Sequence, residues 1–172
     1  MLARDIVKRE LKIGEIPATL LSHQSPDIKL PGVIWYHGWS SSRRSQIFRA
    51  NIIASFGFHV LFADGDLHGD RGSVDYEDVD LAYRELPRVI LKNLEEFPAL
   101  EEAFRENANI DGQIFVTGHS MGAMTAGGIL ANFPSVAGAI CFNGVNDWSL
   151  DQFMDGQRMD PKVAREIERL NP

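Results

Sequence analysis

Ser120 is the residue whose surroundings most clearly indicate chemistry. It is the centre of Gly118-His119-Ser120-Met121-Gly122, which has the pattern G-x-S-x-G. In this pattern a serine lies on a sharp turn from a strand to a helix, and the glycines let neighbouring backbones crowd the turn. The helix N-terminus beside the hydroxyl favours developing negative charge. A plain turn is the alternative. The β-rich apolar run at 113–117 and the small residues at 123–131 favour a nucleophile for acyl transfer.

A second glycine-containing loop, His37-Gly38-Trp39-Ser40-Ser41-Ser42, follows the apolar run at 32–36. In acyl-transfer enzymes with such a serine turn, a loop of this kind supplies one backbone N–H of the oxyanion hole. The residue after the nucleophile supplies the other. We therefore expect Trp39 and Met121 to provide the two N–H groups, with Gly38 allowing close approach. A plain glycine turn is the alternative, but the pairing with the Ser120 pattern favours the functional interpretation.

A serine nucleophile needs a base, and imidazole is the group best suited to that role near neutral pH. No histidine follows His119, whose side chain the sharp turn directs away from Ser120. His37 is interpreted as a hydrogen-bonding brace of its loop, and His68 is the least unfavourable base. Because they lie in the turn and loops around the expected site, His37, Gly38, His68 and His119 are our candidates for contact with substrate.

Asp147 follows the apolar run at 136–142. Some enzymes with a serine turn carry the orienting acid at about this place, so Asp147 is a candidate for that role. The alternative, which we favour, is that Asp147 caps the next helix.

An acidic loop holds four residues of metal-binding type: Asp64, Asp66, His68 and Asp70. Their spacing matches no standard metal site. A polar loop at the mouth of the sheet is the simpler interpretation, so we expect no metal and no cofactor.

The elements that must position these residues alternate between strand and helix patterns. Residues 6–13 and 16–22 alternate apolar and polar residues around a glycine turn, which predicts an antiparallel hairpin. Buried strands are predicted at 32–36, 58–63, 113–117 and 136–142. Helices are predicted at 44–56, 123–131 and 79–108, the last of these broken at Pro87 and Pro98. The tail at 151–170 has a helical pattern, and Pro161 is expected to begin its helix. This order predicts an α/β fold with three layers and a mostly parallel sheet.

Together, the hairpin, the H-G-x-x-S loop at 37–41, the G-x-S-x-G turn and the later strand resemble the α/β-hydrolase fold. More narrowly, they resemble its dienelactone-hydrolase and prolyl-oligopeptidase-like branch of small esterases, which carries a segment similar to His68-Gly69-Asp70-Arg71-Gly72. The resemblance covers residues from about 5 to 147. It implies a serine hydrolase that cleaves a carboxylic ester, or a peptide or thioester, through an acyl-enzyme on Ser120.

The chain departs from this family after Phe142. The family places its acid and its histidine after later strands, and no similar strands follow here. We therefore expect residues 1–172 to be a single, incomplete α/β-hydrolase domain without its last strands, with 148–172 as the start of a helical cap. The alternative is a catalytically inactive binding module, because the triad histidine is absent. The strand at 136–142 would be an open sheet edge, covered by a second copy of the chain or by the C-terminal helix.

The net charge and the apolar content of the chain restrict the classes of partner that it could bind. The formal net charge of −7 over 172 residues argues against nucleic acid or an anionic membrane, and a small-molecule ester is the expected partner. No apolar stretch is long enough to cross a bilayer, and the N-terminus lacks the apolar segment of a signal peptide, so a cytoplasmic location is expected. Cys141 is the only cysteine, which excludes an internal disulfide.

Overall fold

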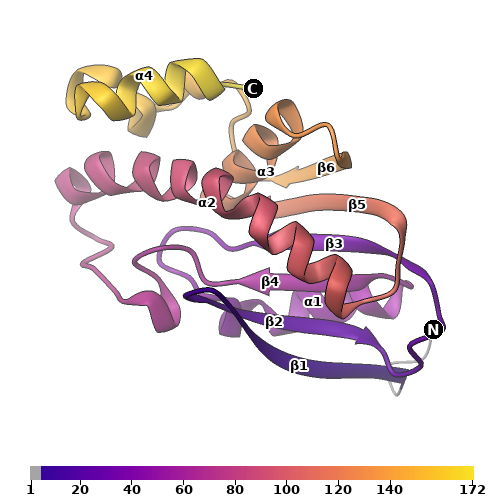
Figure 1. The fold of residues 1–172 in the computed structure, drawn as a ribbon. Coiled ribbons are helices and arrows are strands. Elements are labelled where there is room, and N and C mark those ends of the chain that lie inside the picture. Colours follow the sequence, from indigo (N-terminus) through magenta and orange to yellow (C-terminus); the bar gives the residue numbers. More distant parts are fainter. Residues whose placement is uncertain (1–4) are drawn as a thin grey trace.

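The computed structural model describes residues 5–172, and residues 1–4 of the expected domain lie outside that range. Its centre is a six-stranded sheet with the order β1-β2-β4-β3-β5-β6 (Figure 1). The strands are β1 (Ile6–Ile13), β2 (Ile16–His23), β3 (Leu30–Tyr36), β4 (His59–Ala63), β5 (Ile110–His119) and β6 (Val136–Phe142).

The pairing of the strands confirms the predicted sheet. Strand β2 pairs antiparallel with both β1 and β4, whereas β4, β3, β5 and β6 run parallel to one another. Strands β3 and β4 are buried over most of their length, because helices cover both faces of the sheet there, and this explains their continuous apolar runs. The predicted N-terminal hairpin and mostly parallel sheet are therefore both present.

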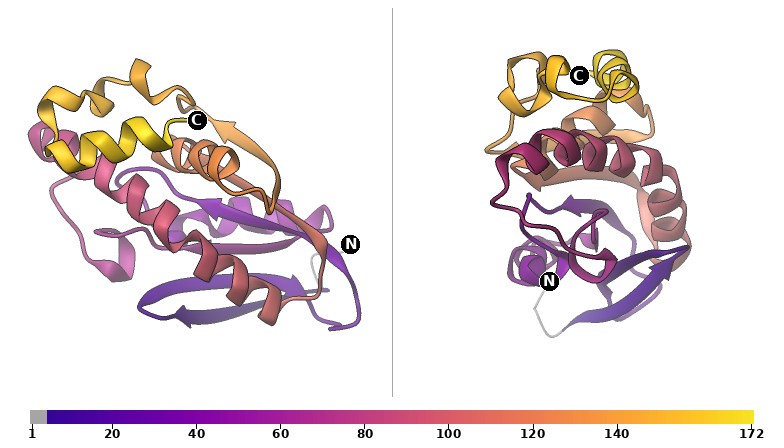
Figure 2. Two further views of the ribbon diagram at one scale, coloured as in Figure 1. Left: turned by 45° about the horizontal axis from the view of Figure 1, so that its top comes forward. Right: turned by 90° about the vertical axis from the view of Figure 1, so that its left-hand side faces the viewer.

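Helices lie on both faces of the sheet and complete the three layers. They are α1 (Ile47–Ser55), α2 (Val79–Asn107), α3 (Met121–Asn132) and α4 (Pro161–Leu170). Helix α1 packs on one face, and α2 and α3 pack on the other. Both views in Figure 2 place α4 outside α2 and α3, away from the sheet. Within residues 5–172, no helix combines the length and the apolar character that crossing a lipid bilayer requires.

Helix α2 corrects one expectation, because it continues through both prolines. A proline inside a helix removes a hydrogen bond and costs about 3 kcal/mol. Here Pro87 and Pro98 lie within a single helix, drawn in Figure 1 as one continuous element across the sheet. That helix buries a long apolar face, with Ile90, Phe97 and Phe104 fully enclosed. Tertiary packing of this face outweighs the local cost of the two prolines.

Strand β6 forms one edge of the sheet. Ile140 and Phe142 on this strand are 63% and 48% exposed. They border an apolar hollow of about 580 Å³ that continues over Trp35 and Phe115 on the α1 face. Helix α4 packs mainly on α2 and α3, so the expectation that it would cover the edge is wrong. A second copy of the chain stays a proposal for that role.

We expect charge on this edge to weaken self-association. Replacing Ile140 with lysine would bury a charge in any interface that pairs β6 with another chain, which disfavours edge-to-edge contact. Sedimentation velocity over a range of concentrations should show a dimer for the native chain and a monomer for Ile140→Lys. The matched control is Val7→Lys on β1, the opposite edge, which should leave the distribution unchanged. A native chain that stays monomeric at every concentration contradicts the prediction.

Candidate active site

Ser120 occupies the sharp turn between β5 and α3. Its backbone has φ 54° and ψ −120°, in a region that residues other than glycine rarely adopt. The Ser120 N–H donates a 2.9 Å hydrogen bond to the Phe142 carbonyl at the end of β6. The serine is therefore held where three parallel strands end, at the start of a helix.

The two glycines of the G-x-S-x-G pattern are required by backbone crowding. A Cβ built on Gly122 would lie 2.2 Å from the Tyr36 carbonyl oxygen. A Cβ on Gly118 would lie 2.4 Å from the Gly122 carbonyl carbon and 2.6 Å from the same Tyr36 oxygen. Real Cβ atoms do not approach backbone so closely, so only glycine lets α3 rest on the end of β3.

Residues with strained backbone conformations lie at the carboxyl edge of the sheet. The positive-φ residues other than glycine in the described chain are Ser40, Leu67, Ser120 and Asn143, with φ of 61°, 59°, 54° and 53°. They follow the ends of β3, β4, β5 and β6 respectively. Open α/β sheets bind ligands at this edge, and strained residues cluster at functional sites.

The loop after β3 lies directly against Ser120. A Cβ on Gly38 would lie 3.1 Å from the His119 carbonyl oxygen and 3.4 Å from the Ser120 Cβ. Met121 opens α3, so its N–H has no acceptor inside the helix. The Trp39 indole donates a 3.2 Å hydrogen bond to the Tyr76 carbonyl, which fixes the loop. The two residues expected to supply the oxyanion donors are thus on the segments that flank Ser120.

A cavity of about 270 Å³ opens beside the serine. Its lining includes Ser120, Met121 and Trp39, together with Tyr76 and Phe153. Tyr76 and Phe153 could not be found from the sequence, because neither belongs to a recognisable motif or to a regular hydrophobic pattern. They reach the site from the segment before α2 and from the short turns before α4.

His37 is buried beneath these loops. Its Nε2 accepts a 2.9 Å hydrogen bond from the Gly65 N–H, so Nδ1 carries the proton and donates to the Gly38 carbonyl at 2.9 Å. Burial lowers the pKa of this imidazole. His37 therefore braces the loops after β3 and β4 with both of its ring nitrogens.

His68 lies behind the wall of the cavity, fully enclosed. Its ring centroid is 5.0 Å from both the Trp39 and the Tyr76 rings, and its Nδ1 is 2.6 Å from the Asp66 carbonyl. Within residues 5–172 its Nε2 has no hydrogen-bond partner. Burial lowers the pKa of His68 to about 4, because protonation would add a buried N–H without an acceptor.

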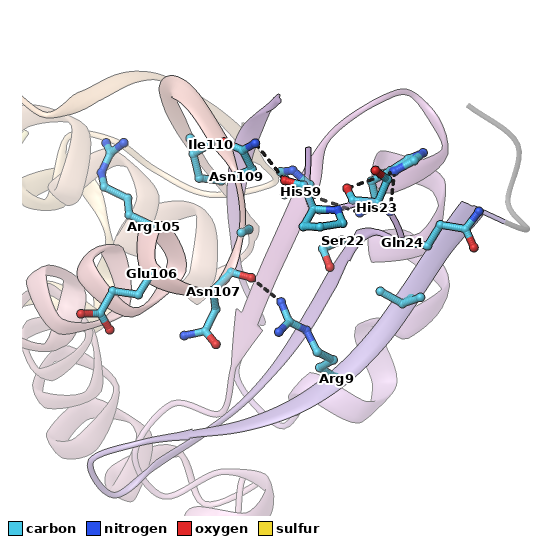
Figure 3. A pocket seen from close by; sticks show the side chains of 14 residues that line it. Arg9, Ser22, His23, Gln24, His59, Arg105, Glu106, Asn107, Asn109 and Ile110 are labelled. Carbon is cyan, nitrogen blue, oxygen red and sulfur yellow. Dashed lines mark hydrogen bonds between the residues drawn. The ribbon is translucent and has the colours of Figure 1, made fainter. Parts of the chain in front are cut away.

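The other three histidines differ in how near they lie to the serine. His119 is exposed and borders the apolar hollow on the α1 face, and its Nδ1 lies 3.4 Å from a Cβ built on Gly38, so its ring also flanks the loop after β3. His23 and His59 line a hollow of about 720 Å³ at the opposite end of the sheet, shown in Figure 3. Of the five histidines in the sequence, none makes a hydrogen bond to the Ser120 hydroxyl in the described chain.

Asp147 is exposed and acts as a cap. Its Oδ1 accepts hydrogen bonds from the Ser149 N–H at 3.1 Å and from the Asn171 side chain at 3.3 Å. Hydrogen bonds from Ser149, and then from Asn171, lower the pKa of this carboxyl. The structure places Asp147 at the start of the short turn at 148–150, the capping position weighed against an acid role.

The acidic loop is organised by an arginine. The buried Asp64 carboxylate accepts hydrogen bonds from the Arg43 guanidinium, from the Arg43 N–H at 2.8 Å and from the Asp70 N–H at 3.1 Å. Gly69 packs so closely on this carboxylate that a Cβ would lie 2.3 Å from Asp64 Oδ1. In the described residues, no group of three or more histidine, cysteine or acidic side chains is arranged to hold a metal ion.

The sheet order, the serine turn after β5 and the adjoining loop after β3 define the α/β-hydrolase fold, and the chain belongs to that class of proteins. Esterase YjfP of Escherichia coli (strain K12) is 38% identical over 137 residues, which are 77% of this chain and 52% of that protein. Putative esterase YitV of Bacillus subtilis (strain 168) is 28% identical over 120 residues, 67% of this chain and 45% of that protein. The chain spans about half the length of these curated relatives. No family model matches it.

Solved structures show the same fold. The crystal structure of TT1662 from Thermus thermophilus superposes with a TM-score of 0.71 at 22% identity, covering 95% of this chain and 66% of that one. An acylaminoacyl peptidase of Pyrococcus horikoshii superposes with a TM-score of 0.62 at 18% identity, covering 84% of this chain and 24% of that one. The predicted resemblance to α/β-hydrolase-fold esterases is confirmed.

Adding one methyl group at Gly122 should destabilise the fold. The new Cβ of Gly122→Ala would force α3 away from the Tyr36 carbonyl, at an expected cost of about 2 kcal/mol or more. Urea unfolding followed by circular dichroism measures this loss. Gly138→Ala on β6 is the control, because its Cβ would meet Phe115 at an ordinary 3.4 Å. Equal stability of the two variants contradicts the crowding described for the turn.

Stability should fall as the solution is acidified from pH 6.5 toward 4. His68 has a pKa of about 4 in the folded chain and 6.5 ordinarily, so below pH 6.5 the unfolded chain takes up its proton first. The buried His37 and His59, whose pKa values burial also lowers, act in the same direction. His68→Phe should flatten the decline without abolishing it, as measured by urea unfolding at each pH.

The control for the pH experiment is His119→Phe, which removes an exposed imidazole and should keep the native slope. An unchanged slope in His68→Phe contradicts the assignment of acid sensitivity to His68.

Proposed function

We propose that this chain carries the nucleophile and the oxyanion hole of a serine hydrolase that cleaves carboxylic esters. The observation that carries the proposal is Ser120 itself. It sits at positive φ between β5 and α3, beside Met121 and the Trp39 loop, and it lines a cavity. The curated relatives are named as an esterase and a putative esterase, which supports the same reaction class.

The arrangement suits acyl transfer. Ser120 Oγ would attack the ester carbonyl, and the carbonyl oxygen would become an oxyanion held by the N–H groups of Trp39 and Met121. The N-terminus of α3 adds favourable potential for that negative charge. Loss of the alcohol would leave an acyl group on Ser120, which water would then hydrolyse. Peptides and thioesters carry a carbonyl of the same geometry and are variants of the proposal.

A base must take the Ser120 proton, and this requirement favours a second candidate function. His37 uses both ring nitrogens, and His68 is enclosed behind Trp39 and Tyr76. His119 lies beside Gly38 but makes no hydrogen bond to Ser120 in the described chain. His23 and His59 line the hollow at the opposite end of the sheet. Hydrolysis therefore needs a base other than these five side chains in their described positions. Without one, the same scaffold would bind a ligand without turning it over.

A fluorophosphonate probe separates the two functions. The hydrolytic function predicts, by intact-mass spectrometry, one adduct on the native chain, none on Ser120→Ala and one on Ser73→Ala, an exposed serine that serves as the control. Such probes require an activated serine, so the adduct reports on the proton acceptor as well as on the hydroxyl. Absence of any adduct on the native chain would favour the binding module.

A further inference from the structure

The cavity beside Ser120 has apolar walls. Its lining includes the rings of Trp39, Tyr76 and Phe153 and the side chains of Leu86, Met121 and Met124. These walls come from the loop after β3, the segment just before α2, the first turns of α2, the start of α3 and the turns after β6. At about 270 Å³ the cavity is smaller than most ligand pockets, which measure about 300–1,000 Å³.

The polar atoms of Trp39 and Tyr76 already have hydrogen-bond partners within the protein. The Trp39 indole N–H donates to the Tyr76 carbonyl at 3.2 Å, and the Tyr76 hydroxyl donates to the Leu67 carbonyl at 2.7 Å. Neither the N–H nor the O–H is therefore free to donate a hydrogen bond to an anionic group on a ligand. The aromatic rings offer only their apolar surfaces to the cavity.

The charged residue among the lining side chains is an acid, Asp151. Its Oδ1 accepts a 2.8 Å hydrogen bond from the Phe153 N–H and caps the following turn. No lysine, arginine or histidine is among the residues that line this cavity in the described chain. A ligand carboxylate placed here would meet a like charge without a compensating cation, which costs binding energy in a partly desolvated site.

The wall that carries Asp151 and Phe153 is anchored to α2. The Phe153 ring lies 4.9 Å from the Tyr83 ring. The Arg158 guanidinium stacks 3.8 Å above the same Tyr83 ring and approaches Asp80 at 3.5 Å. This wall is therefore preorganised, and its acidic group has a fixed position.

We propose that this site selects neutral esters with a compact apolar acyl or alcohol group, and that Asp151 excludes esters that carry a carboxylate. The proposal rests on the proposed function at Ser120 and names its substrate class. The cavity size and the aromatic walls select the compact apolar group, and Asp151 selects against negative charge.

Methionine-methyl NMR tests the selectivity without requiring turnover. Met121 and Met124 line the cavity, whereas Met154 and Met159 do not and report on folding. In a Ser120→Ala background, methyl pentanoate should shift the Met121 and Met124 signals. Monomethyl glutarate, the same skeleton with a carboxylate in place of the terminal methyl group, should bind about tenfold more weakly.

Matched variants assign the discrimination to one carboxylate. Asp151→Asn keeps a capping side chain and should reduce the preference to about threefold or less. Asp155→Asn is the control, because Asp155 caps the next turn through the Gln157 N–H at 3.0 Å and does not line the cavity. It should keep the tenfold preference.

The outcomes separate this proposal from the proposed function. Equal binding of the two esters, no shift of Met121 and Met124, or an unchanged preference in Asp151→Asn overturns the selectivity proposal, even if the probe labels Ser120. Selective binding with no probe adduct supports the selectivity of the pocket and removes the hydrolytic function instead.

Discussion

The contact between α3 and the end of β3 is the constraint on which the site depends. With glycine at positions 118 and 122, the first turn of α3 can rest on the Tyr36 carbonyl, where any Cβ would collide. That contact brings the segment after Tyr36, with Gly38 and Trp39, against Ser120. The positions of the two candidate oxyanion donors thus follow from one backbone contact, and each lies on a segment held by the sheet.

A buried ion pair extends this organisation to the loop after β4. Asp64 is fully enclosed, and an unpaired carboxylate there would carry a large desolvation cost. Arg43, from the turn before α1, supplies the countercharge and also reaches Asp70 at 2.9 Å. The loops after β3 and β4 are therefore tied together, which holds His68 and Tyr76 behind and beside Trp39. This connection between the two loops supports the aromatic wall of the cavity beside Ser120.

Much of the fold could be predicted from the sequence because its strands are short apolar runs bounded by clear turns. Ser120 and the Trp39 loop could be placed because each follows such a run. The continuity of α2 could not, because local proline chemistry argues for a break and only the buried face of the helix overrides it. Tyr76, Asp151 and Phe153 could not be placed either, since they meet Ser120 through tertiary packing and belong to no motif. Asp147 caps the short turn at 148–150, which is the role that its place in the sequence favours.

The strained residues at the carboxyl edge of the sheet differ in whether the proposed chemistry uses their side chains. Each left-handed residue other than glycine costs about 1–3 kcal/mol. At Ser40, Leu67 and Asn143 a glycine would relieve that cost without removing a group that the proposed chemistry uses. At Ser120 the strained residue also carries the hydroxyl, so relief of strain and loss of the nucleophile are the same substitution. The conflict between stability and chemistry in this fold is thereby confined to a single position of the chain.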